Sequence, residues 1–190
     1  MAANYRIAEP YMGAVPVTQT NTFNSSVGSA PQAFLQHRLG MQVRAFDAQT
    51  GENLGAGIFQ YCACSGAATS VGKGDWVQIV GKTAIPLAAA NSDSAFPVGI
   101  AAGNISASNV AGWVQIYGLV DYGRCTDSAV VAGKPLYICA GTTGLALSNV
   151  VTGNQIWGAV AHVSGNSTNN TGAISYQLNF PRLLHSKEVF

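Results

Sequence analysis

The chain has 190 residues and little charge: 9% of its residues are charged, whereas 48% are hydrophobic. Soluble domains carry about 25% charged residues, and a dispersed monomer needs a charged surface without apolar patches. Nine basic and eight acidic residues leave a net charge of +1, and no segment concentrates Lys and Arg. Phosphate binding needs clustered cations, so the composition argues against nucleic acid, membrane surfaces and polyanionic substrates. It favours a component of a protein assembly.

The length allows one domain with an arm, or two small domains. No apolar run has the length of a signal peptide or approaches the about 18 residues of a membrane helix. We therefore expect synthesis and assembly in a cytosol, where the four cysteines remain thiols. A domain of this size needs no metal or disulfide for stability.

Residues 1–40 are expected to form an extended N-terminal arm. The segment mixes aromatic residues with Pro, Asn, Ser, Thr and Gly, without helix or strand periodicity. Disordered tails rarely combine several aromatic residues with so few charges, so we favour an arm that docks on a neighbour over a mobile tail. Only residues 31–39 could form a short helix, which Gly40 would end. The residues of the arm expected to contact a neighbour are Tyr5, Arg6, Tyr11, Phe23 and Phe34.

Residues 41–180 are expected to form a β domain, followed by a C-terminal tail at 181–190. Short apolar, β-branched and aromatic runs recur between turns rich in Gly, Asn and Ser. This spacing is typical of a β-sandwich or barrel-like domain of short antiparallel strands. The predicted strands are 41–47, 57–64, 75–80, 97–101, 113–120, 135–139, 155–162 and 173–180.

A weak internal repeat lies within this domain. Gly74 opens a predicted strand and Gly99 follows 25 residues later; Gly133 and Gly158 repeat the arrangement 59 residues further on. This predicts two similar β-units at about 74–103 and 133–162, although 22 glycines make coincidence the alternative. A second repetition conflicts with that offset: the sequence Trp-Val-Gln-Ile at 76–79 occurs again at 113–116, which is 37 residues later. We favour the 59-residue repeat because it aligns both ends of the unit.

No pattern indicates catalysis, so we expect no enzymatic activity and no cofactor. His37, His162 and His185 lie in separate parts of the chain, and no serine stands in a Gly-X-Ser-X-Gly elbow. The acidic residues form neither a calcium loop nor an obvious acid/base pair. The three tryptophans each fall in a predicted strand. We favour core or inter-subunit packing for them over a platform for a ligand.

The cysteines offer only an incomplete metal site. Cys62 and Cys64 lie on one face of a predicted strand, since side chains repeat every second residue. A zinc site needs two further ligands, which Cys125, Cys139 or a histidine would have to supply without any paired spacing. We favour packing as small hydrophobic residues and expect no metal.

Five short motifs occur in an order that resembles the small β-rich decoration, or cement, proteins of tailed-phage capsids. The resemblance covers about residues 40–162. It implies a protein that binds the outside of an icosahedral head, often as a symmetric oligomer, and locks neighbouring capsomers without catalysis or a cofactor. The Cys62 and Cys64 pair and the long aromatic arm have no place in that pattern. The motifs are Gly57-Ile-Phe-Gln-Tyr61, Gly74-Asp-Trp-Val77, Val98-Gly-Ile-Ala101, Gly112-Trp-Val-Gln-Ile-Tyr-Gly118 and Gly133-Lys-Pro-Leu-Tyr137.

We therefore expect a structural virion protein on the capsid surface, with the major capsid protein and further copies of itself as partners. Three alternatives remain. One is another virion component, such as a head fibre base or a tail protein. The second is a jelly-roll coat protein that builds the shell; its arm would commonly be basic, whereas this arm has only Arg6 and Arg38. The third is an enzyme or lectin-like module on the virion surface.

Overall fold

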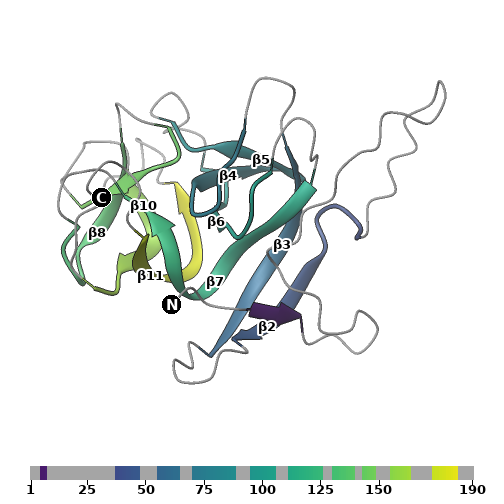
Figure 1. Cartoon of the computed structure of the whole chain (residues 1–190). Coiled ribbons are helices and arrows are strands. Elements are labelled where there is room, and N and C mark those ends of the chain that lie inside the picture. The colour runs from purple at the N-terminus through teal and green to yellow at the C-terminus, as the bar shows by residue number, and fades with distance from the viewer. Residues whose placement is uncertain are drawn as a thin grey trace.

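The structure is a computed structural model that describes residues 5–7, 37–47, 55–64, 70–88, 95–105, 111–125, 130–139, 143–148, 155–163 and 173–183. These residues form eleven strands and no helix (Figure 1), so the predicted mainly β class is confirmed. The strands are β1 (Tyr5–Ile7), β2 (Gln42–Asp47), β3 (Ala56–Cys64), β4 (Trp76–Val80), β5 (Thr83–Pro86), β6 (Val98–Ala101), β7 (Ala111–Arg124), β8 (Pro135–Ile138), β9 (Ala146–Leu147), β10 (Gln155–Ala161) and β11 (Ala173–Leu183).

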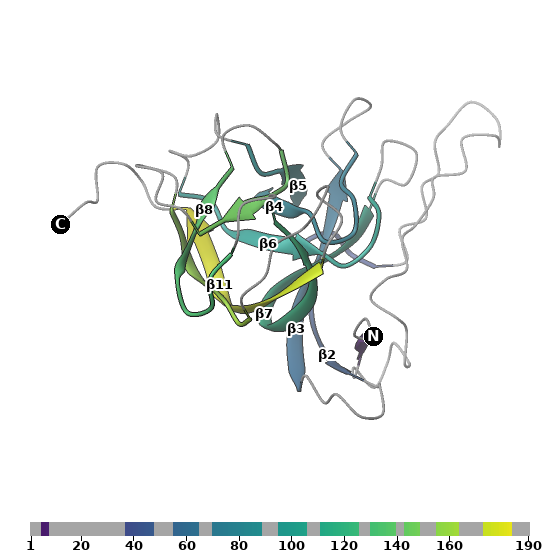
Figure 2. The same cartoon turned by 60° about the vertical axis from the view of Figure 1, so that its left-hand side comes forward.

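The strands pair in the order β1-β2-β3-β5-β4-β6-β7-β11-β10-β8-β9, and β3 also pairs with β7. The pairings β3–β5, β5–β4, β4–β6, β6–β7 and β7–β3 therefore close a ring of five strands. The β3–β5 pair is parallel and the other four are antiparallel. Figures 1 and 2 show the long strand β7 between β2 and β3 on one side and β8 and β11 on the other.

The ring separates two hydrophobic cores. Its interior holds one cluster, to which β3, β4 and β7 contribute Cys62, Val77, Ile79, Val114 and Ile116. A larger cluster fills the opposite face of the same strands and continues under β8, β10 and β11; it includes Phe59, Tyr61, Trp76, Trp113 and Tyr176. Because side chains alternate along a strand, β3 and β7 supply both cores. The apolar run Val98–Ala101 is accordingly buried on both faces of β6.

Matching turns precede β4 and β8, the two strands that open the proposed repeat. Gly74 has φ 86° and Gly133 has φ 74°. The amide of Asp75 donates to the carbonyl of Gly72 over 3.1 Å, and the amide of Lys134 donates to that of Val131 over 3.1 Å. In both units the strand after the turn pairs antiparallel with the returning strand, β4 with β6 and β8 with β10. The returning strands of the two units differ, because the register of β10 shifts in its pairing with β11 and in its pairing with β8.

Candidate functional site

Tyr5, the first of the expected contact residues, belongs to the protein's own core. Strand β1 pairs with β2, placing Tyr5 opposite Asp47. The Tyr5 ring lies 5.1 Å from that of Phe59, and its hydroxyl donates to the carbonyl of Leu119 over 2.5 Å. The side chain is 1% exposed, and burial raises its pKa to about 12. In this structure Tyr5 therefore holds the N-terminal strand on the sheet, which differs from the expected role on a neighbour's surface.

Arg6 lies on the opposite face of the same short strand. It is half-buried and is paired in register with Phe46, whose side chain is 52% exposed. Tyr11, Phe23 and Phe34 lie outside the described residues, as does most of the expected helix at 31–39. The pairing of β1 with β2 therefore places Arg6 beside Phe46, an exposed aromatic residue that the sequence analysis did not select.

Three exposed aromatic side chains, those of Phe46, Tyr117 and Phe180, lie on or next to one row of paired residues across the sheet. Register places Arg44 beside Ile58, Ile58 beside Tyr117, and Tyr117 beside Asn179, so these residues form a row across β2, β3, β7 and β11. We call this row, together with Phe46 and Phe180, the outer-face row; Ile58 within it is half-buried and packs against the cluster in the ring interior. The described residues with exposed large hydrophobic side chains are Phe46, Phe96, Tyr117, Val131, Trp157, Val160, Val163 and Phe180.

Phe180 owes its exposure to an irregular backbone in β11. Its φ of 48° lies in the left-handed region, which costs an ordinary residue about 1 to 3 kcal/mol. The ring lies 5.3 Å from that of Tyr117 and remains 52% exposed. The ring of Phe180 therefore extends the exposed aromatic surface of Tyr117.

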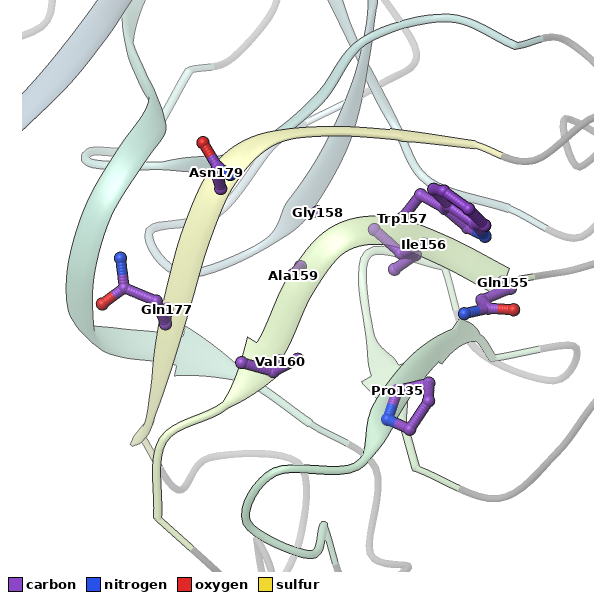
Figure 3. Close-up of a pocket in the computed structure, with 9 residues that line it drawn as sticks. All are labelled: Pro135, Gln155, Ile156, Trp157, Gly158, Ala159, Val160, Gln177 and Asn179. Atoms are coloured by element: carbon purple, nitrogen blue, oxygen red, sulfur yellow. The ribbon is translucent and has the colours of Figure 1, made fainter.

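A shallow groove of about 280 Å³ lies at the far end of this sheet, along β10 (Figure 3). Strand β10 leaves Trp157 48% exposed and Val160 38% exposed. Trp76 and Trp113 are buried, as core packing predicts, so Trp157 is the exception among the three tryptophans. The groove is lined by Pro135, Gln155, Ile156, Trp157, Gly158, Ala159, Val160, Gln177 and Asn179.

The acidic residue Asp75 anchors the turn before β4. It is 7% exposed, receives a 2.5 Å ion pair from Arg124 and accepts a 2.7 Å hydrogen bond from the amide of Gly72. Burial raises the pKa of Asp75, and its two partners oppose that shift. The side chain therefore ties the turn to β7, which is a structural role.

The four cysteines are divided among three hydrophobic clusters, and Cys64 packs against the same cluster as Cys62. Cys62 lies in the ring interior, Cys125 in the larger core and Cys139 in a third cluster beside Leu145. Burial raises the pKa of the Cys62 thiol to about 12. Within the described ranges, no three His, Cys, Asp or Glu side chains are grouped so that they could hold a metal ion. That part of the chain also contains no helix suited to spanning a membrane.

Comparison with known proteins adds no relative. No protein-family model, no curated protein and no solved structure matches the chain.

Proposed function

We propose that the chain is a structural virion protein that binds the outer surface of an icosahedral phage capsid and stabilises contacts between capsomers. One observation carries the proposal. A chain with 9% charged residues exposes the aromatic side chains of the outer-face row, and one of them, Phe46, lies opposite Arg6 and two residues from Arg44 on β2. Aromatic residues and Arg are enriched in protein interfaces, whereas Lys and Glu are depleted. Large exposed apolar patches mark such interfaces.

Such a protein acts through contacts that exist only in the assembled shell. Burial of the outer-face row supplies about 25 cal/mol per Å² of apolar area, and the loss of rotational and side-chain freedom opposes it. A single contact need only be modest, because many equivalent sites on one shell raise the overall affinity. The activity requires neither a catalytic residue nor a cofactor.

The partners in this proposal are the major capsid protein and further copies of the chain. A head fibre base or a tail protein would use a similar surface, but at a different copy number and position on the particle. A jelly-roll coat protein would instead form empty shells from purified chain alone. Electron microscopy of the particle, with the chain labelled, separates these alternatives by position.

The proposal is tested by cosedimentation of the purified chain with undecorated shells of the phage that encodes it. Deleting residues 1–40 would also remove β1 and Tyr5 from the core, so point variants are the sharper test. We expect Phe46→Ala and Tyr117→Ala each to lower occupancy at subsaturating concentration. Val131→Ala is the control, because Val131 is 44% exposed but lies in the turn before β8.

Two outcomes would contradict the proposal. The wild-type chain would fail to bind the shells at any concentration tested, or it would bind with an occupancy that neither outer-face substitution changes. Circular dichroism of each variant separates a loss of binding from a loss of the fold.

A further inference from the structure

Strand β10 differs from its counterpart in the first unit in having one uncovered face. All four residues of β6 are buried, because the ring covers both of its faces. In β10, Ile156, Ala159 and Ala161 are buried in the larger core, whereas Trp157 and Val160 are exposed. The uncovered face is the floor of the groove along β10.

A bulge in β10 gives the groove its shape. The register against β11 shifts between Trp157 and Ala159, and Gly158 between them has φ 75°. A Cβ on Gly158 would lie 2.6 Å from the carbonyl oxygen of Asn179. Only glycine therefore allows the two strands to approach so closely here. The bulge re-aims the side chains on either side of it.

The lining combines an aromatic ring with amides. Figure 3 shows Trp157 and Gln155 toward one end of β10, with Gln177 and Asn179 on the neighbouring strand β11. Register sets Gln177 directly beside Val160. Among the nine described residues that line the groove, none has an ionisable side chain. Specific small-molecule sites likewise join apolar and aromatic walls to a few polar groups.

We infer that this groove binds a neutral saccharide. A sugar ring offers an apolar C–H face, which can lie against the half-exposed indole of Trp157, and hydroxyl groups that both donate and accept hydrogen bonds. The amides of Gln155 and Asn179 can also donate and accept, and the Oε1 of Gln177 can accept while its Nε2 donates to the carbonyl of Leu178 over 3.3 Å. These groups match hydroxyl groups without placing a charge opposite them. A nucleotide or phosphorylated ligand would require cations, which the lining lacks. A neutral, polyhydroxylated ligand fits this combination best.

The inference is tested with an array of neutral hexose and N-acetylhexosamine oligosaccharides that also carries sialylated and sulfated ones. The full-length chain should bind a subset of the neutral glycans. The strongest binder is then titrated in solution by isothermal calorimetry. Trp157→Ala and Gln177→Ala should each weaken binding by about tenfold or more. Phe46→Ala is the matched control, because it removes an aromatic side chain of similar exposure at the other end of the sheet.

The possible results separate this inference from the proposed capsid function. Loss of glycan binding in Trp157→Ala, with shell binding retained, supports it. No binding to any neutral glycan, binding to acidic glycans alone, or equal binding by wild type and Trp157→Ala would overturn it. One further result would also overturn the inference: the wild type binds no sugar, and Trp157→Ala loses shell binding or self-association. The groove would then be a protein contact. Shell binding by Phe46→Ala reports on the proposed function separately.

Discussion

At the scale of single residues, Gln115 shows how a polar side chain stabilises the interior of this sheet. It is fully buried, yet its Nε2 donates to the carbonyls of Tyr117 and Leu119 over 3.1 and 3.0 Å. Its Oε1 accepts a 2.7 Å hydrogen bond from the hydroxyl of Tyr122. These bonds span the bend of β7 at Gly118, which has φ 96°. Gln115 therefore determines the path of the strand that joins both cores.

We predict that Gln115→Leu lowers the free energy of unfolding by about 3 kcal/mol. The substitution keeps the volume but leaves the Tyr122 hydroxyl without its acceptor and removes one hydrogen bond each from the carbonyls of Tyr117 and Leu119, of which the Leu119 carbonyl keeps its bond from Tyr5. A buried unpaired group costs about 1 to 3 kcal/mol. Urea denaturation followed by circular dichroism measures the change. Gln42→Leu is the control, because Gln42 makes only an exposed bond to Gln60, and it should change stability by less than about 0.5 kcal/mol. Equal effects of the two variants would contradict the assigned role.

At the scale of elements, the paired turns before β4 and β8 allow a matched test. Gly74 and Gly133 both have positive φ, but a Cβ on Gly74 would lie 2.2 Å from the backbone carbonyl oxygen of Tyr122, whereas one on Gly133 would meet nothing within 4 Å. We predict that Gly133→Ala costs about 1 to 2 kcal/mol, the strain of the left-handed backbone alone. Gly74→Ala should cost about 3 kcal/mol or more, because the clash adds to the strain.

Thermal or urea unfolding of both glycine variants measures these costs. Similar destabilisation of the two would show that the turn before β4 does not contact β7 as described. Gly81→Ala is a further control, since Gly81 has φ 63° and open space around the Cβ position.

The sequence predicted the strands with strong local patterns and missed the short ones. All eight predicted strands occur, and the alternation read from 41–47 matches the burial of Val43 and Ala45 in β2. The missed strands β1, β5 and β9 have two to four residues each. Such segments are too short for periodicity to show; they pair because neighbouring strands offer them an edge. Strand β11 also runs to Leu183, three residues into the expected tail.

The candidate sites were harder to predict, because they too depend on which strands pair and in which register. The exposure of Trp157 depends on a register shift in β10, and register is a property of two strands that one segment cannot reveal. Tyr5 was expected on a neighbour because its surroundings lack a strand pattern, yet pairing with β2 places it in the core. The low charge drew attention to the surface, but the location of Phe46 and Phe180 could be found only from the fold.

At the scale of the whole molecule, the buried tyrosines predict a sharp loss of stability in alkali. Burial raises the pKa of Tyr5 to about 12 and also raises those of Tyr61, Tyr122 and Tyr176. The unfolded chain releases these protons near the ordinary tyrosine pKa of about 10, whereas the folded chain retains them. Since the folded state then binds more protons, the free energy of unfolding should fall as the pH rises above about 10.

Absorbance of tyrosinate and circular dichroism, recorded together during an alkaline titration, measure this effect. Of the seven tyrosines, the buried four should ionise only as the circular dichroism signal is lost. Tyr5→Phe should reduce the dependence of stability on pH above about 10. Ionisation of all seven tyrosines near pH 10 with the fold intact would be the opposite result.

The ring of five strands also determines when the nascent chain can become stable during translation. A ribosome releases β3 early, but its partner β7 is complete only at Arg124, and the larger core needs β11, which ends at Leu183. Pairing between such distant segments is slow compared with local hairpins. Until translation reaches the last strand, apolar faces of β3 and β7 remain without their partners, a state that favours aggregation. The yield of folded protein therefore depends on how well the cell protects that nascent chain.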